Sequence, residues 1–511
     1  MIRKLLGLLL LLAAPGVAHA EWHEASTPHF IVYSDEKPER LKVFATQLVR
    51  FDKALRFLRN LPDAPIGDAN RVTVFVVGGT GTISRLANDR FVAGFYAGRA
   101  GGSVAFVPRR SGDGSEHDLS PQAILLHEYT HHFLLSLSEE AAYPGWFVEG
   151  YAEFFAASSF EADGAFFFGR PPLYRAQGLL GHGNLLPMNK LLNSDALKLN
   201  DEQREGLYGR GWLLTHYLFL GGKREGQLGA YLNALNAGTP PLDAAKVFGD
   251  LRTLDKELDR YLLGRLSARR IDPRVLAIGE ISVRKLRPAE ADTMAVRIRS
   301  KSGVNQKIAP DVYAAARKAC APYPNDPAAQ RVLTEAAYDA RDFAGAEAAA
   351  DRILAAEPRS VDALLYKAWA KAGIAEKAGD RSAPTWTAIR KLIATANRID
   401  PENPEPLWYY FQAYERAGVT PPKLARDGLY YAFQLAPQDP GLRFAAARSY
   451  LQDGNAAKAR ALLTTLAWDP HRGGIAAVAA KLIAEIDAGH ADTALRDLEK
   501  QSEDAAKPEG S

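Results

Sequence analysis

Residues 124–135 read ILLHEYTHHFLL, an apolar helical run that contains the motif H-E-x-x-H. Residues four apart lie on one face of a helix, so His127 and His131 can direct two imidazoles at one metal ion. Glu128 lies one step round the helix, where it can reach a metal-bound water. With 11 histidines in 511 residues, chance produces this motif with a probability on the order of 1%. The stretch therefore predicts a zinc-binding helix with Glu128 as general base.

A second stretch, residues 144–153, reads PGWFVEGYAE and predicts a turn followed by a helix. A zinc site with two histidine ligands needs a third ligand and leaves a fourth position for water. Glu149 can supply that ligand. Glu153, one turn further on, can accept a hydrogen bond from the free ring nitrogen of a ligand histidine. The alternative for both acids is a solvated helix face, which the surrounding aromatic residues disfavour because buried charges need partners.

A third stretch, residues 208–218, reads YGRGWLLTHYL. Hydrolysis of an amide passes through a tetrahedral intermediate whose oxyanion needs a hydrogen-bond donor besides the metal. We expect Tyr208, placed just before a helix, to be that donor. The alternative for Tyr208 is a tyrosine of the core.

Composition narrows the kind of protein and the kind of metal site. The chain is 47% hydrophobic and 24% charged, which excludes a disordered chain and a multi-pass membrane protein. Its formal charge of +3 is close to balance and gives no indication of a nucleic-acid partner. Its one cysteine, Cys320, excludes a disulfide framework and a cysteine-rich zinc site. Any metal ligands must therefore be histidine, aspartate or glutamate.

The first twenty residues have the pattern of a signal peptide. Arg3 and Lys4 precede an apolar run at residues 5–14, and the small-x-small triplet at 18–20 predicts cleavage after Ala20. The run is too short for a comfortable membrane span, although an uncleaved anchor is the alternative. We expect a periplasmic or secreted protein without a stable membrane span after cleavage.

The remaining chain divides into two parts near residue 270. Strand-like and helical patterns alternate in residues 21–270, which predicts one α+β domain. Residues 271–303 alternate again and predict a linker or hairpin. Residues 304–490 are alanine-rich and helical, and a polar, flexible tail is expected at residues 491–511.

The helical part repeats. Short acidic-proline joints recur with spacings of 34, 43, 36 and 33 residues, at Pro324, Pro358, Pro401, Pro437 and Pro470. A period near 34 is that of the tetratricopeptide helix-turn-helix repeat. Small residues at Ala346 and Ala459 take equivalent places, and the longer unit predicts an insertion around residues 379–387. We therefore expect an all-α tetratricopeptide-repeat solenoid, whose concave grooves suit a protein partner.

Together these motifs resemble the gluzincins, the clan of thermolysin and the zinc aminopeptidases. In that clan H-E-x-x-H is followed by a helix carrying N/S-E-G-x-A, which residues 149–152 match from the glutamate onward, while Val148 departs from it. The resemblance implies a zincin-like fold, Glu149 as zinc ligand, Glu153 as the acid that orients a zinc histidine, and Tyr208 as oxyanion donor. Overall, residues 25–270 look like the peptidase-MA-like domain that exported bacterial proteins carry fused to tetratricopeptide repeats.

The resemblance also implies a substrate strand. Zinc aminopeptidases carry a Gly-x-Met-Glu-Asn segment on a strand that lines the cleft, and residues 101–106 correspond to it but lack the acid. Exopeptidase specificity is therefore doubtful, and endo- or exopeptidase action stays open. We still expect Gly102, Ser103 and Val104 to pair with a substrate backbone.

These observations favour an exported zinc metallopeptidase in which Glu128 takes a proton from a zinc-activated water and the repeats recruit substrate or partner. One alternative is a catalytically silent scaffold of the cell envelope that binds protein partners through its repeats. Another is a zinc hydrolase of non-peptide amides, such as a cell-wall crosslink.

Overall fold

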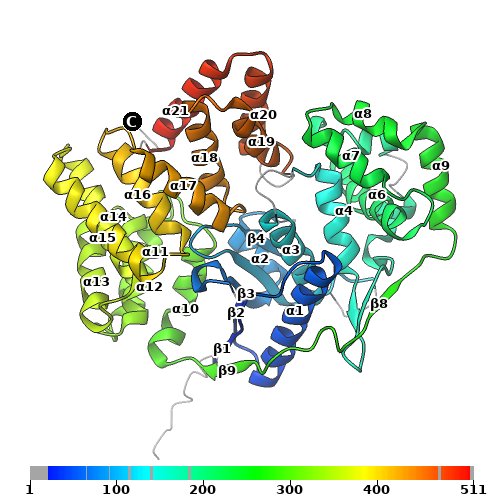
Figure 1. The fold of residues 1–511 in the computed structure, drawn as a ribbon. Coiled ribbons are helices and arrows are strands. Elements are labelled where there is room, and N and C mark those ends of the chain that lie inside the picture. Colours follow the sequence, from blue (N-terminus) through cyan, green and yellow to red (C-terminus); the bar gives the residue numbers. More distant parts are fainter. Residues whose placement is uncertain are drawn as a thin grey trace, which may run out of the picture.

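The computed structural model describes residues 21–506 except residues 65, 91, 113–116, 138–141, 182–185 and 470–472. The expected signal peptide and the joint at Pro470 lie outside the described residues. The chain forms a mixed α/β part followed by a long run of helices (Figure 1). Within the described ranges, no helix has the length and apolar character needed to span a membrane.

The α/β part is built from short strands and from helices of very different lengths. Its strands are β1 (His23–Ser26), β2 (Phe30–Ser34), β3 (Val72–Gly79), β4 (Phe95–Ala97), β5 (Val104–Arg110), β6 (Ser159–Phe160), β7 (Phe166–Phe168), β8 (Arg269–Ile271) and β9 (Ser282–Lys285). Its α-helices are α1 (Pro38–Leu58), α2 (Thr80–Ala87), α3 (Pro121–Ser136), α4 (Gly145–Ala156), α5 (Met188–Leu191), α6 (Asp201–Leu220), α7 (Gln227–Asn236), α8 (Pro241–Ala244), α9 (Leu251–Leu262) and α10 (Pro288–Lys301). Short helical turns are η1 (Asp68–Asn70), η2 (Leu173–Arg175), η3 (Gln177–Gly181), η5 (Ser194–Ala196) and η6 (Ala245–Phe248).

The main sheet has the strand order β4-β5-β3-β2-β1-β9. Strands β2, β3 and β5 run parallel, and β4, β1 and β9 are antiparallel to their neighbours. Parallel strands are buried on both faces, and β3 accordingly reads VTVFVVGG. Val74 packs into the core under α1 and α3, whereas its neighbour Phe75 packs into a second core with Ile83 of α2 and Met294 of α10. The helices thus cover both faces of the sheet.

Helices α4 and α6 approach each other closely at a pair of glycines. A Cβ added to Gly150 would lie 2.4 Å from the backbone carbonyl of Gly211, and one added to Gly211 would lie 2.8 Å from the Trp146 carbonyl oxygen. No side chain fits at either position, so the two glycines set the distance between these helices. This contact holds α4, which carries Glu149, against the core.

The expected linker at residues 271–303 is instead part of the α/β fold. Strand β8 pairs with β7 in a small sheet of order β6-β7-β8, and β9 pairs with β1 at the edge of the main sheet. Helix α10 then buries Met294 and Ile298 against the same sheet. The alternating apolar pattern of this segment therefore reflects a strand on the sheet edge, where a linker or a small hairpin was expected.

The helical part packs each helix mainly against its neighbours along the chain. Its helices are α11 (Ala309–Cys320), α12 (Pro327–Asp339), α13 (Phe343–Ala356), α14 (Val361–Lys377), α15 (Ala383–Ile399), α16 (Pro404–Arg416), α17 (Lys423–Leu435), α18 (Pro440–Gln452), α19 (Ala456–Ala467), α20 (Gly473–Asp487) and α21 (Ala491–Ala506). Ala346 and Ala459 are fully buried at the places where the sequence predicts small residues. The extra residues of the 43-residue unit lengthen α14 and α15 to 17 residues each.

Two further features of this helical array bear on the sequence predictions. The expected flexible tail begins with helix α21, because Ala494 and Leu498, four residues apart, form a buried stripe.

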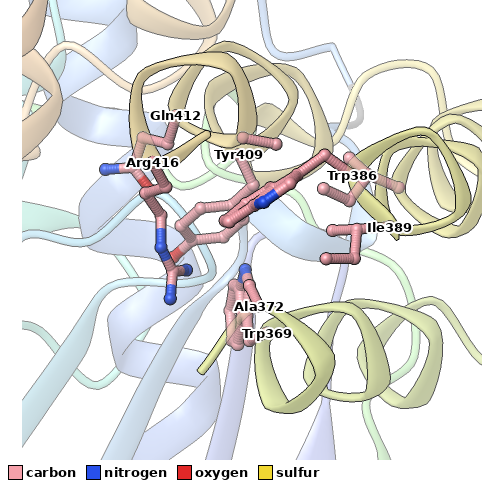
Figure 2. A pocket seen from close by; sticks show the side chains of 9 residues that line it. Trp369, Ala372, Trp386, Ile389, Tyr409, Gln412 and Arg416 are labelled. Carbon is pink, nitrogen blue, oxygen red and sulfur yellow. The ribbon is translucent and has the colours of Figure 1, made fainter. Parts of the chain in front are cut away.

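Between α14, α15 and α16 a small cavity of about 10 Å³ remains beside Trp369, Trp386 and Tyr409 (Figure 2). A gap of that size holds about one water molecule, so the aromatic cluster is a packing feature of the array.

Candidate metal centre

The helix that carries H-E-x-x-H is fixed at its start and along its apolar side. Ser120 caps α3 by accepting a hydrogen bond from the Ala123 amide at 3.1 Å, and Pro121 follows in the first turn, where proline is tolerated. Leu126, Tyr129 and Phe133 lie on one side of α3 and are buried in the core beneath the sheet. His127 and His131 lie on the opposite side of the helix, where α3 packs against α4.

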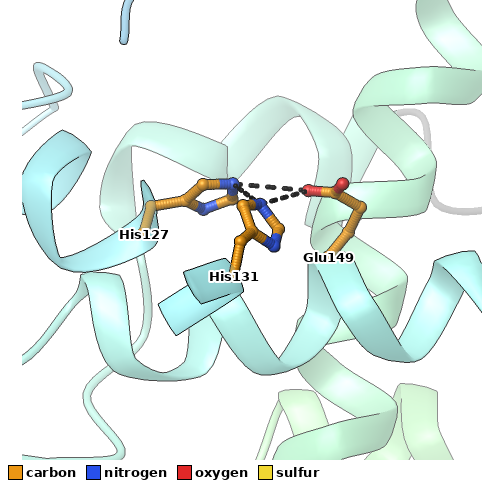
Figure 3. Close-up of side chains that lie close together, drawn as sticks. All are labelled: His127, His131 and Glu149. Carbon is orange, nitrogen blue, oxygen red and sulfur yellow. Dashed lines mark hydrogen bonds and ion pairs between the residues drawn. The ribbon is translucent and has the colours of Figure 1, made fainter. Parts of the chain in front are cut away.

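His127, His131 and Glu149 converge on one point (Figure 3). The two Nε2 atoms lie 3.0 Å apart. Glu149 Oε2 lies 3.3 Å from His127 Nε2 and 3.8 Å from His131 Nε2. The structure therefore brings together the three side chains that the sequence assigns as ligands.

The separations and the donor types of this trio fit a zinc ion. Ligand bonds of about 2.0–2.1 Å in a tetrahedral site place neighbouring ligand atoms about 3.3 Å apart, and the three observed separations bracket that value. Two imidazole nitrogens and one carboxylate oxygen also form a donor set that zinc favours and that leaves a position for water. The arrangement can therefore hold a zinc ion with little movement of the three side chains.

Glu149 is held by the start of its own helix as well as by the glycine contact with α6. The Gly145 amide, in the first turn of α4, donates to both carboxylate oxygens of Asp195 at 3.1 Å. Burial raises the pKa of Asp195 to about 7. Sequence reasoning did not single out Asp195, because it lies 50 residues further along the chain.

Glu153 lies where the sequence predicts it, on the far side of His127 from the metal position. Its Oε1 atom is 3.4 Å from His127 Nδ1. Burial alone would raise the pKa of Glu153, but Arg175 and His127 hold it down to about 2. For His127 burial acts in the opposite direction and would lower the pKa, yet in the metal-free chain Glu149 and Glu153 raise it to about 10. Glu153 is therefore a buried carboxylate that orients the His127 ring.

The partners of Glu153 were missed by sequence reasoning. Arg175 donates to Glu153 Oε1 from Nη2 at 2.7 Å and from Nε at 3.1 Å, and Tyr174 donates its hydroxyl to Oε2 at 3.0 Å. Arg175 also pairs with Glu205 at 3.2 Å. Both donors come from η2, a short turn without helical periodicity, so their residue types alone gave no signal.

Tyr208 is close to the centre, although not in the local structure expected. It lies inside α6, because a capping box formed by Asn200 and Gln203 starts that helix at Asp201. The Tyr208 ring centroid lies 6.2 Å from that of His127, and the Arg175 guanidinium lies 4.3 Å from the Tyr208 ring centroid.

The Tyr208 hydroxyl keeps its proton at ordinary pH. The negative charge of Glu149 and burial together raise the pKa of Tyr208 well above its usual value. A protonated hydroxyl in this position can donate a hydrogen bond into the site.

Glu128 lies on α3 next to the edge of the sheet. A Cβ added to Gly94, just before β4, would lie 3.4 Å from Glu128 Cγ and only 2.2 Å from Ile124. Gly94 therefore allows the start of the edge strand to lie close to α3 and Glu128. The negative charge of Glu128 also helps to raise the pKa of Tyr208.

The expected substrate strand does not have a free edge. Val104 opens β5 and pairs with Thr73 of β3 on one side and with Ala97 of β4 on the other. The Ser103 carbonyl oxygen accepts a hydrogen bond from the Thr73 amide at 2.9 Å, and the Ser103 hydroxyl accepts one from Tyr96. Val104 therefore has a strand on each side, and the outermost strand on this side of the sheet is β4. The expected pairing with a substrate backbone is therefore wrong for Val104, because the short edge strand β4 gives little signal in the sequence, and it stays a prediction for Gly102 and Ser103.

A second cluster of buried polar groups anchors α3 from its opposite side. Asp52 of α1 accepts hydrogen bonds from Tyr129 at 2.6 Å and from Arg56 at 2.9 Å, and its Oδ2 lies 2.6 Å from His29 Nδ1. These three partners satisfy the carboxylate without a metal. The cluster therefore ties α3 to α1 and fixes the orientation of the ligand-bearing helix.

Comparisons with known proteins add little to this geometry. No family model matches the chain, and no curated protein matches it. Among solved structures, the crystal structure of a thermophilic TPR protein from Thermus thermophilus is similar to part of the chain, with 19% identity and a TM-score of 0.32, covering 38% of this chain and 96% of that one. The description of the mixed α/β part and of the helical array therefore comes from the structure itself.

Proposed function

We propose that the protein is a zinc-dependent hydrolase of peptide bonds. The observation that carries the proposal is the convergence of His127, His131 and Glu149, buried and within 4.8 Å of one another. Glu128 and Tyr208 beside this trio supply the proton acceptor and the donor that amide hydrolysis needs. The wider resemblance to gluzincins supports the same chemistry.

In this proposal each residue of the chain has a separate task. A bound zinc ion would supply the Lewis acid that acidifies water and polarises the scissile carbonyl. Glu128 takes the proton from the attacking water and passes it to the leaving amine. Tyr208 donates its hydroxyl hydrogen bond to the developing oxyanion. Glu153, held by Arg175, keeps the His127 ring oriented.

The proposal is tested by loading and unloading the metal. The purified chain is stripped with a chelator, reloaded with one equivalent of zinc, and incubated in each state with a diverse peptide library. We expect cleavage only in the zinc-loaded state, and loss of bound zinc in Glu149→Gln but not in Glu202→Gln on the surface of α6. One zinc per chain without cleavage of any peptide would overturn the proposal.

A second candidate function rests on the helical array. Neighbouring helices stack in pairs over about 200 residues, an architecture typical of surfaces that bind proteins. Under this alternative the metal centre is structural and the protein is a scaffold. One zinc per chain without cleavage of any peptide would favour the scaffold. Extending the same screen to non-peptide amides would show whether the protein is instead a hydrolase of cell-wall crosslinks.

Export to the periplasm or the medium is also a proposal, supported by the pattern of residues 1–20. Sequencing the N-terminus of the protein from a bacterial host tests it directly. A mature protein that begins at Glu21 is expected, and an intact Met1 in the cytoplasmic fraction would contradict it.

A further inference from the structure

The loop between β4 and β5 is packed into the helical array. Ala100 is 2% exposed and belongs to the same buried cluster as Phe411 and Phe433. Its amide donates to Asp439 Oδ2 at 2.8 Å. The connection between two strands of the α/β part is thus completed by residues more than 300 positions further along the chain.

Two glycines allow this contact. A Cβ added to Gly98 would lie 2.3 Å from the backbone carbonyl oxygen of Gln438, and one added to Gly101 would lie 2.3 Å from the carboxylate of Glu405. Neither glycine has a positive φ, so the local backbone conformation would accept a side chain at both positions. It is the helical array that leaves no room for one. The Glu405 side chain can swing away, whereas the Gln438 carbonyl is fixed, which makes Gly98 the more demanding position.

A chain of hydrogen bonds continues from the array to the helix of the metal centre. Gln438 Nε2 lies 3.4 Å from Ser103 Oγ. The Tyr96 hydroxyl lies 3.0 Å from the same Ser103 oxygen and 2.8 Å from His132 Nδ1. His132 is the neighbour of the ligand His131 on α3. The array, the β4–β5 hairpin and α3 are therefore joined by directional contacts.

From these contacts we infer that Gln438 and Asp439, at the corner between α17 and α18, are positioning residues for the metal centre. They hold the β4–β5 hairpin in place, and the hairpin holds α3 through Tyr96 and lies beside Glu128. The helical array then supports the metal centre through the hairpin. The expected effect on catalysis rests on the proposed hydrolase function, whereas the positioning of the hairpin and of α3 does not.

Replacing Asp439 by asparagine separates its two roles. Asp439 Oδ1 caps α18 by accepting from the Leu442 amide at 2.8 Å, and asparagine is an equally good cap. The amide group of Asn cannot accept from the Ala100 amide once its oxygen serves the cap. Asp342→Asn, at the cap of α13 and away from the hairpin, is the matched control.

Gly98→Ala breaks the same contact from the other side. The added methyl group meets the fixed Gln438 carbonyl, while Gly229→Ala, with nothing within 4 Å of the new Cβ, is its control. Hydrogen exchange of the metal-free chain is measured for the β4–β5 hairpin and for residues 129–133 of α3. We expect exchange about fivefold or more faster in both segments for Asp439→Asn and Gly98→Ala, and no change for the two controls.

The result is readable whether or not the chain hydrolyses peptides. Unchanged exchange in the hairpin, or unchanged exchange in α3 despite a loosened hairpin, overturns the inference. If the wild type is active, both variants should lower kcat more than they raise KM, because they misplace the helix of the centre without touching substrate. An inactive wild type would refute the proposed hydrolase and leave the exchange comparison standing.

Discussion

Arg175 donates to a single oxygen of Glu153 from two of its nitrogens, Nη2 at 2.7 Å and Nε at 3.1 Å. Both side chains are largely buried, at 15% and 1% exposure. A carboxylate held this firmly can fix the ring of His127 without drifting toward the metal itself. Arg175 and Glu153 thus support His127, the first of the three proposed zinc ligands.

Replacing Arg175 by lysine keeps the charge but removes the two-nitrogen contact. Glu153 orients the His127 ring, and residues in that role typically contribute about 10–100-fold to metal affinity. Because Arg175 holds Glu153 in place, we expect the variant to lose zinc affinity by about 10-fold, the lower end of that range. Competition with a chromophoric chelator measures it. Arg170→Lys, on the same loop but in an exposed ion pair with Glu161, should bind zinc like the wild type, and equal affinities for all three proteins would contradict the role of Arg175.

Zinc binding should release a proton. In the metal-free chain the pKa of His127 is raised to about 10, so this ring is protonated at pH 7 and must lose its proton to become a ligand. Glu153 stays ionised because its pKa is about 2. Zinc affinity should therefore rise with pH, about tenfold per unit between pH 7 and pH 9. Calorimetry in two buffers of different ionisation enthalpy measures the proton, and an affinity independent of pH would disprove this assignment.

Tyr208→Phe removes the proposed oxyanion donor while keeping the ring. Since such a donor acts in the transition state, kcat should fall about 10²–10³-fold with little change in KM. Steady-state kinetics on a peptide identified by the library screen provide the measurement. Tyr431→Phe, at a position 44% exposed in the helical array, serves as the control. A variant with wild-type kcat would remove Tyr208 from the mechanism.

Gly150→Ala tests the close packing of α4 on α6. The new methyl group would lie 2.4 Å from the Gly211 carbonyl, so the helices must separate. Overpacking of this kind costs about 1–3 kcal/mol of the free energy of unfolding, and the shift of Glu149 should weaken zinc binding as well. Denaturant unfolding and chelator competition measure the two effects, with Gly229→Ala as control; a variant as stable as the wild type would refute the packing argument.

The sequence predicted that His127 and His131 face one point because four residues separate them on one helix, and the same spacing relates Glu149 to Glu153. That Glu149 would meet the two histidines was expected from the short distance between the two helices along the chain and from the resemblance to the gluzincins. The sequence also predicted helical pairing in the C-terminal half, where buried alanines recur. It did not predict Arg175, whose position depends on a short turn, or Asp439, whose partner lies in another part of the fold. Contacts between distant segments have no periodicity, and those contacts complete the site.

Glu128→Gln is the most direct test of the central claim, since it changes the proposed base and none of the three ligands. Initial rates of peptide cleavage are compared for wild type and variant at equal, measured zinc content. The account predicts that the variant holds one zinc per chain, keeps the wild-type fold and loses cleavage by about 10²–10⁴-fold. Cleavage by the variant at the wild-type rate would contradict it.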